Sequence, residues 1–240
     1  MQAIIMAAGK GSRLGDLTKG NPKSFVEING KKLIEYNLEI LKELGVDKIV
    51  IVTGYREEAF GELTKDMPEV VLKYNPFYGM VNVLGSFYMG MEDLTDDFIY
   101  LHADTLCAKS VFDELVKFEG DVNLPVEFKP CDEEAMKVRS ENGQIVQITK
   151  EMPIDDAQGE FIGIASFKRE MIPVVKAKAK EALKEEQFLA YFETVIQKMI
   201  DDKKYDIRMV DIQDAFWAEI DFLEDYEQAV ERLKEKNYEL

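Results

Sequence analysis

The 240-residue sequence predicts an α/β fold, in which a doubly wound, mostly parallel sheet carries a mixed edge or a small lobe. Three observations support this prediction. Short apolar runs alternate with amphipathic stretches over roughly the first hundred residues. A succession of short apolar runs replaces this alternation between Val122 and Phe167. A glycine-rich turn directly follows the first apolar run, at the strand end where such sheets bind their ligands.

The parallel part is expected from four strands with three helices between them. Strands are predicted where apolar residues recur at every second position, and helices where they recur every three or four. The predicted strands are Gln2–Ala8, Lys48–Thr53, Val70–Tyr74 and Phe98–Leu101, and the predicted helices are Leu33–Leu44, Arg56–Lys65 and Val81–Met91. Alternation at this spacing favours a parallel, Rossmann-like sheet with helices on both faces.

The remaining elements predict a less regular second part. They are short strands at Val122–Phe128, Ile145–Thr149 and Phe161–Phe167, helices at Arg169–Glu185 and Phe188–Asp201, a strand pair at Ile207–Ile212 and Phe216–Ile220, and a charged helix from Leu223. Successive strands without intervening helices are typical of a mixed sheet edge. Because no linker, repeat or low-complexity segment interrupts the sequence, a single domain over residues 1–240 is predicted.

Charge is distributed unevenly along the sequence. The chain carries 30 Lys or Arg against 47 Asp or Glu, yet residues 1–32 carry six basic against two acidic residues. A sequence isoelectric point near 4.6 argues against nucleic acid and anionic membranes as main partners. The positive stretch therefore indicates that the ligand is a small polyanion, such as a nucleotide or a phosphate ester.

Cysteine content and hydropathy bear on the cellular compartment. Cys107 and Cys131 are too few for a disulfide framework, which indicates reduced thiols. The apolar run Ala3–Ala8 is too short for the core of a signal peptide or for a membrane span. We therefore expect a soluble protein of the cytoplasm.

The glycine-rich turn lies within the positive stretch. Its pattern is Gly9-Lys10-Gly11-Ser12-Arg13, and Pro22-Lys23 follows. Glycines allow backbone N–H groups to face a polyphosphate, and a helix start at this point would add its dipole. Arg13 is suited to hold phosphate oxygens in a fork, whereas Lys23 supplies a mobile point charge. Any tight turn also needs glycine, so a purely structural loop remains an alternative.

Two common phosphate-binding motifs do not fit this turn. A Walker A loop would require glycine where the sequence has Ile4, and the dinucleotide-binding pattern would require glycine where it has Leu14. The sequence therefore supports neither a P-loop nor an NAD site.

The stretch Ala7-Ala8-Gly9-Lys10-Gly11-Ser12-Arg13, together with Pro22-Lys23, resembles the signature of the sugar-phosphate nucleotidylyltransferases. The similarity continues through Leu33-Ile34-Glu35-Tyr36 and Val52-Thr53-Gly54-Tyr55. The resemblance implies a nucleoside triphosphate as substrate, with Arg13 and Lys23 in catalysis. The nucleotide-binding residues that it implies are Ala8, Gly9, Gly11, Ser12, Arg13, Lys23, Asn82 and Ser86.

Two aspartates at strand ends, Asp104 and Asp221, are the expected metal ligands. A tetra-anionic triphosphate calls for a divalent cation, and Mg²⁺ favours one or two carboxylates together with phosphate oxygens. A lone aspartate after a strand is ordinarily a helix cap or a turn residue. Members of the family resembled carry Asp-x-Asp where this chain has His102-Ala103-Asp104, and their second acid binds metal. The role of His102 stays open.

The segments that would bind the acceptor depart from the hexose-1-phosphate enzymes of this family. The usual Gly-Thr-Ala-Gly type helix start becomes Asn82-Val83-Leu84-Gly85-Ser86, and Glu-Lys-Pro becomes Lys150-Glu151-Met152-Pro153. These features look more like the cytidylyltransferases that activate phosphocholine or 2-aminoethylphosphonate. The resemblance places acceptor binding at roughly residues 122–202, with Lys150 at the phosphorus end. The candidates for the ammonium end are Glu160, Tyr191, Glu193, Trp217 and Glu219.

The expected function is CTP-dependent transfer of CMP to a small phosphonate or phosphate ester, with Mg²⁺ as cofactor and release of pyrophosphate. One alternative is a hexose-1-phosphate nucleotidylyltransferase that makes an NDP-sugar. Another is a non-catalytic nucleotide-binding module. The sequence leaves open the nucleobase, the acceptor and the oligomeric state.

Overall fold

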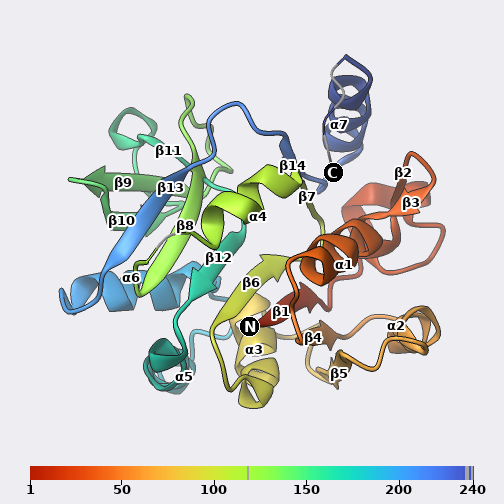
Figure 1. The fold of residues 1–240 in the computed structure, drawn as a ribbon, viewed down its shortest axis with the longest axis horizontal. Helices are drawn as coiled ribbons and strands as arrows, with labels where there is room; N and C mark the ends of the chain where they lie inside the picture. Colours follow the sequence, from red (N-terminus) through yellow and green to blue (C-terminus); the bar gives the residue numbers. More distant parts are fainter. Residues whose placement is uncertain (118, 236–237, 239) are drawn as a thin grey trace.

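The computed structural model describes residues 1–117, 119–235, 238 and 240, and contains a ten-stranded sheet in the order β11-β9-β10-β13-β8-β12-β6-β1-β4-β5 (Figure 1). Its strands are β1 Gln2–Ala7, β4 Lys48–Thr53, β5 Val70–Tyr74, β6 Phe98–His102, β8 Val122–Glu127, β9 Lys137–Glu141, β10 Gln144–Thr149, β11 Gly159–Phe161, β12 Ile164–Phe167 and β13 Ile207–Asp211. Two short ladders join β2 Glu27–Ile28 to β3 Lys31–Lys32, and β7 Thr105–Cys107 to β14 Trp217–Glu219.

Strands β5, β4, β1 and β6 are parallel to one another and form the doubly wound part of the sheet. All six residues of β1 are buried, and their side chains alternate between the two faces of the sheet. Ile4 and Met6 pack in one cluster with α3 (Val83–Gly90). Ala3 and Ile5 pack in another with α1 (Leu33–Glu43), α2 (Glu57–Thr64) and α4 (Lys109–Leu115). The predicted α/β class is therefore confirmed.

The second half of the sheet is mixed. Strand β12 is antiparallel to both β6 and β8, whereas β13 is parallel to β8. Strand β8 also pairs with β11, so the pairings of β8, β11, β9, β10 and β13 close into a small ring. Helix α6 (Glu193–Asp201) packs on β10 and on α5 (Ile172–Lys184). This ring is the predicted small lobe, and Figure 1 shows its strands gathered at the opposite end from β4 and β5.

Three predicted elements differ from those observed. The expected strand Phe161–Phe167 is broken into β11 and β12 at Ile162-Gly163, where Gly163 has φ +77°. The expected helix Phe188–Asp201 begins only at Glu193, because carbonyls at 188 and 190 accept hydrogen bonds from the start of α3. The expected strand pair near residues 207–220 does not form, since β13 joins β8 and β10 while β14 joins β7.

Strands β7 and β9 and helix α4 were not expected from the sequence. The last long helix, α7, runs from Leu223 to Glu235, starting where the charged helix is predicted. Among the described residues, no helix combines the length and the apolar character that crossing a bilayer would require.

Candidate active site

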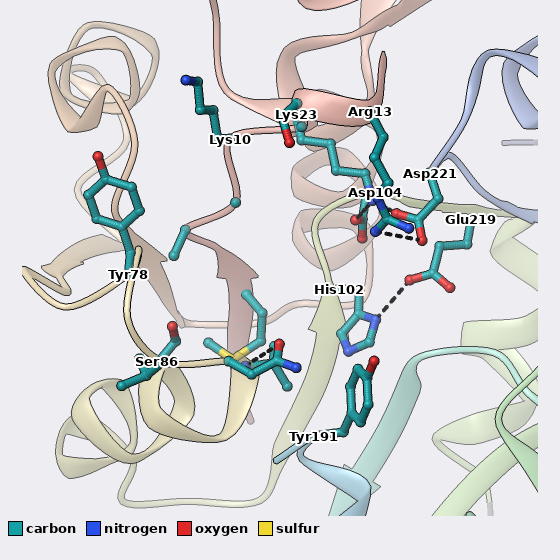
Figure 2. Close-up of a pocket in the computed structure, with 18 residues that line it drawn as sticks. Lys10, Arg13, Lys23, Tyr78, Ser86, His102, Asp104, Tyr191, Glu219 and Asp221 are labelled. Carbon is teal, nitrogen blue, oxygen red and sulfur yellow. Dashed lines mark hydrogen bonds and ion pairs between the residues drawn. The ribbon is translucent and has the colours of Figure 1, made fainter. Parts of the chain in front are cut away.

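A cavity of about 330 Å³ lies where β1 and β6 end, and it is lined by residues from distant parts of the chain (Figure 2). The carboxyl ends of parallel strands are the usual ligand site of such sheets. Of the residues predicted from the sequence, those that line it are Ala8, Gly9, Gly11, Ser12, Arg13, Lys23, Asn82, Ser86, Asp104, Tyr191, Glu219 and Asp221. Lining residues that sequence reasoning did not assign are Met6, Lys10, Tyr78, Val81, Val83 and His102.

The loop after β1 is shaped by close approach to Lys23. Gly11 has φ +68°, and a Cβ atom at this position would lie 2.9 Å from Cβ of Lys23, so only glycine fits. Residues Ser12–Thr18 form 3₁₀ turns that are interrupted at Gly15, rather than an α-helix. The helix start at this point is therefore a short 3₁₀ turn, and the loop also offers backbone N–H groups and side-chain cations.

Lys23 lies between the two carboxylates predicted to bind metal. Its Nζ atom donates hydrogen bonds to Asp104 Oδ2 and Asp221 Oδ1, which come from residues 81 and 198 positions away. Arg13 approaches the same Asp221 carboxylate, with Nη2 3.3 Å from Oδ2. Figure 2 shows these four side chains converging on one point. The fold thus brings the predicted metal ligands and the predicted catalytic cations together.

The ionisation of this cluster follows from its charges. Burial by itself lowers the pKa of Lys23, but the adjacent carboxylates raise it more, so its pKa lies above the ordinary value. Burial raises the pKa of Asp104, yet the charges of Lys23 and His102 lower it further, to below its ordinary value. In the ligand-free protein, Lys23 is therefore a cation and Asp104 an anion at neutral pH.

His102 lies at the end of β6 between two partners. Its Nδ1 is 3.2 Å from Glu219 Oε1, and its Nε2 is 2.8 Å from the hydroxyl of Tyr100 (Figure 2 shows the contact with Glu219). Burial lowers the pKa of His102, but the hydrogen bond and charge of Glu219, with the charges of Glu193 and Asp104, raise it to about 9. The ring is therefore an imidazolium at neutral pH in the ligand-free protein.

Two groups of side chains could hold a divalent cation. Asp104 and Asp221 offer carboxylate oxygens around the position of Lys23 Nζ. His102, Asp104 and Glu219 offer one ligand atom each, and these atoms lie within 4.8 Å of one another. An imidazolium has no lone pair for a metal, so protonation of His102 and metal binding by it are alternatives. The first group matches the oxygen ligands that Mg²⁺ prefers.

A second cavity of about 380 Å³ adjoins the first and shares Glu219 and Asp221 with it. Four of the predicted acceptor-binding residues line this second cavity, namely Lys150, Glu160, Trp217 and the shared Glu219. The Nζ atom of Lys150 lies 5.1 Å from the ring centroid of Tyr191, which lines the first cavity. The predicted acceptor-binding residues therefore extend along both cavities.

Glu193, also predicted to bind the acceptor, lines neither of these two cavities. Its side chain is only 3% exposed, and its Oε2 atom has no hydrogen-bond partner among the described residues. Burial raises its pKa, and its charge acts on His102. The structure thus places Glu193 behind the cavity wall.

The sequence model of the family described as "MobA-like NTP transferase domain" matches residues 3–123. The chain belongs to this family. Choline-phosphate cytidylyltransferase of Haemophilus influenzae is 30% identical to it over 97% of each chain. The 2-aminoethylphosphonate cytidylyltransferase of Lancefieldella rimae is 41% identical over 38% of this chain and 37% of its own. The solved CTP:phosphocholine cytidylyltransferase of Streptococcus pneumoniae superposes with a TM-score of 0.83, at 27% identity, over 97% of this chain and 98% of its own.

Membership makes the chain an NTP transferase, and nucleotidyltransferases of this family generally use a divalent metal ion.

The side chains of two residues predicted to bind the nucleotide, Asn82 and Ser86, form hydrogen bonds with other groups of the protein. Asn82 Oδ1 accepts from the N–H of Val83 at 2.8 Å, and its Nδ2 donates to the carbonyl of Leu189 at 3.1 Å. Ser86 is 4% exposed, and its Oγ accepts from Nδ2 of Asn75 at 2.9 Å. Both side chains line the cavity, so these bonds also fix the shape of its wall.

Proposed function

We propose that this transferase moves CMP from CTP to a small phosphonate or phosphate ester, either 2-aminoethylphosphonate or phosphocholine, and releases pyrophosphate. One observation carries the proposal: the nucleotide cavity and the second cavity meet at Glu219 and Asp221, beside the cluster of Lys23 and Asp104. Two substrates bound on either side would bring their reacting phosphorus groups to this junction. The similarity to cytidylyltransferases of phosphocholine and 2-aminoethylphosphonate supports CTP as the nucleotide and these two compounds as acceptors.

The proposed roles follow from charge and position. The backbone of Gly9, Gly11 and Ser12 faces the triphosphate, and Arg13 holds its β and γ phosphates. Lys23 stabilises the negative charge that develops at the α phosphoryl group. An acceptor oxygen attacks the α phosphorus in line, the bond to the bridging oxygen breaks, and the electron pair leaves with pyrophosphate. The attacking oxygen is already anionic, so no general base is required.

Mg²⁺ is the proposed cofactor, and the donor set fits it. Asp104 and Asp221 already converge on a cation, the Lys23 ammonium, and both offer oxygen atoms. When bound, Mg²⁺ would neutralise charge on the triphosphate. Lys23 would then leave the carboxylates and turn towards the phosphates, a short movement for its flexible side chain.

The proposed acceptor-binding part extends beyond the predicted residues 122–202. Lys129, Lys150 and Glu160 belong to that range, but Trp217 and Glu219 on β14 complete the cavity. We keep a single nucleotidyltransferase domain over residues 1–240 as the proposed organisation. We also propose a reducing cytoplasm as the compartment, since Cys107 and Cys131 are both free and buried.

A coupled assay of pyrophosphate release tests this function. The purified protein is offered CTP, UTP, dTTP, ATP and GTP, each with aminoethylphosphonate, phosphocholine and glucose-1-phosphate, in the presence of Mg²⁺. We expect turnover with CTP and one of the first two acceptors, and Asp104→Asn should lower kcat on the order of a hundredfold. Faster turnover of glucose-1-phosphate with UTP or dTTP would establish the sugar alternative instead. Calorimetric binding of CTP without pyrophosphate release for any acceptor would establish a non-catalytic nucleotide-binding module.

A further inference from the structure

At the second cavity, Trp217, Glu127 and Glu160 form a cage around the ammonium group of Lys129. The Nζ atom of Lys129 lies 4.8 Å from the ring centroid of Trp217. It is also 2.7 Å from Oε2 of Glu127 and 2.9 Å from Oε2 of Glu160. An aromatic face beside carboxylates is the environment that recognises organic ammonium ions.

The sheet itself holds Lys129 in this position. Strands β8 and β11 are antiparallel, and their register places Glu127 directly opposite Glu160. Like charges opposite one another destabilise a sheet, and these two side chains are only 23% and 17% exposed. Burial lowers the pKa of Lys129, but its hydrogen bonds to the two carboxylates raise the pKa above its ordinary value. Lys129 is therefore a cation that neutralises a repulsion built into the strand pairing.

Trp217 is equally constrained. Its side chain is 6% exposed, and its Nε1 donates to Oε2 of Glu127 at 2.8 Å. The ring is therefore fixed relative to Glu127, and the Lys129 ammonium lies over its face. A ligand that needs this face has to displace Lys129 and leave its charge without the two carboxylates. Such a ligand would have to break two hydrogen-bonded ion pairs to gain one cation–π contact, and a quaternary ammonium has no N–H with which to replace their hydrogen bonds.

The two proposed acceptors differ in the group that would meet this cage. An acceptor with its phosphorus group at Glu219 and Asp221 would point its other end into the second cavity. A trimethylammonium group has no N–H, so it depends on an aromatic face. A primary ammonium donates up to three hydrogen bonds. It can therefore bind to a carboxylate of the second cavity, such as Asp132, without contacting the indole ring.

We propose that Lys129 determines acceptor specificity: by covering Trp217 and pairing with Glu127 and Glu160, it excludes a quaternary ammonium and selects acceptors that carry a primary ammonium. This inference rests on the proposed function and decides between its two acceptors in favour of aminoethylphosphonate.

Fluorescence tests the cage without any turnover, because Trp217 is the single tryptophan of the chain. Tetramethylammonium chloride is titrated into the wild type, Lys129→Ala and Lys129→Met, with NaCl as the ionic-strength control. We expect saturable quenching in Lys129→Ala at a concentration at least about tenfold lower than any response of the wild type. Lys129→Met keeps a long side chain over the ring and should behave like the wild type. Equal responses of wild type and Lys129→Ala would overturn the proposal.

Two further variants serve as a control and as a substitute in this experiment. Lys198 also bridges two acids, at 2.9 Å from Glu181 and 3.1 Å from Glu185, but on α6, so Lys198→Ala should leave the titration unchanged. If Lys129→Ala does not fold, the double variant Lys129→Ala with Glu160→Gln removes the repulsion and leaves Trp217 and Glu127 to bind the probe. Absence of saturable quenching in that folded double variant contradicts the proposal.

Steady-state kinetics then test whether Lys129 determines acceptor specificity. With CTP at saturation, kcat/KM for aminoethylphosphonate should exceed that for phosphocholine by about tenfold or more in the wild type. In Lys129→Ala this ratio should fall by about tenfold, through a lower KM for phosphocholine, with the KM for CTP unchanged. The proposal that Lys129 determines acceptor specificity would be wrong if the wild type preferred phosphocholine, or if Lys129→Ala left the ratio of the two kcat/KM values unchanged. If no acceptor supports pyrophosphate release from CTP, the proposed function is wrong. The fluorescence titration still shows whether Lys129 keeps an ammonium ion away from Trp217.

Discussion

The side of the cleft that we propose for the nucleotide and the side that we propose for the acceptor are built in different ways. On the proposed nucleotide side, one short segment from Gly9 to Lys23 supplies the glycine-rich loop and its cations. On the acceptor side, Lys129, Glu160 and Trp217 come from three separate strands or loops and are held by contacts across the ring of strands. The comparison indicates that the nucleotide side is a local motif, whereas the acceptor side depends on strand register and can diverge by single substitutions.

The sharpest test of this difference is Lys23→Ala on the nucleotide side. It removes a side chain that donates hydrogen bonds to both Asp104 and Asp221, so we expect kcat to fall on the order of a hundredfold or more for every acceptor. The rate of pyrophosphate release measures this fall in kcat. Lys42→Ala, on the exposed surface of α1, is the control for loss of a positive charge and should keep full activity. A loss that depended strongly on the acceptor would contradict the separation of the two sides.

Gly11→Ala tests whether the loop positions Lys23. Its added Cβ would lie 2.9 Å from Cβ and 3.1 Å from Cα of Lys23, so we expect kcat/KM for CTP to fall on the order of tenfold to a hundredfold. Gly20→Ala is the matched control, because Gly20 also has a positive φ, +75°, but a Cβ added there would meet no atom within 4 Å. Gly20→Ala should lose about 1 kcal/mol of stability in urea unfolding and Gly11→Ala more, because of its contact with Lys23, and only Gly11→Ala should lose activity.

The same contrast explains what could be predicted from the sequence. Strand β1 and the loop that ends at Lys23 are encoded by neighbouring residues, and their pattern predicts both a phosphate site and its cations. The pairing of Asp104 with Asp221 is visible only through family resemblance, since they lie 117 positions apart in the sequence. Lys129 has no local signature, because its partners Glu160 and Trp217 are defined by the register of β8 with β11 and by the position of β14.

Short strands escaped prediction for the same reason. Strand β7 has three residues, too few for a periodicity to be recognised, whereas its partner β14, about 110 residues further along the chain, lies within the predicted strand Phe216–Ile220. Strand β9, Lys137–Glu141, reads as a polar segment because it includes a lysine that is in fact buried. Burial of a polar side chain depends on partners that no local pattern specifies.

Lys137→Met tests how the acceptor side is held. Lys137 is 1% exposed, and its Nζ donates to the carbonyls of Glu133, Ala135 and Lys150 at 3.1, 3.4 and 2.8 Å. Without these bonds the carbonyls lose their partner, so we expect a loss of about 2 kcal/mol in urea unfolding. The KM for the acceptor should rise severalfold while the KM for CTP stays unchanged.

The control for that variant is Lys117→Ala, which removes an exposed lysine paired with Glu114 and should change stability by less than about 0.5 kcal/mol. A shared rise of both KM values in Lys137→Met would show that the ring of strands and the nucleotide loop do not behave separately.

The smallest expected effect concerns Asn82, where the two sides touch. Its Nδ2 donates to the carbonyl of Leu189, two residues before Tyr191, and its Oδ1 caps α3. Asn82→Ala should therefore cost about 1 kcal/mol and raise the KM for the acceptor a few-fold, because the segment that carries Tyr191 is released. Ser86→Ala, one turn further along α3, removes only the acceptor of the Asn75 hydrogen bond and should leave both KM values unchanged. If Asn82→Ala instead raised the KM for CTP more than that for the acceptor, Asn82 would bind the nucleotide, as the sequence resemblance implies. The border between the two sides would then lie beyond α3.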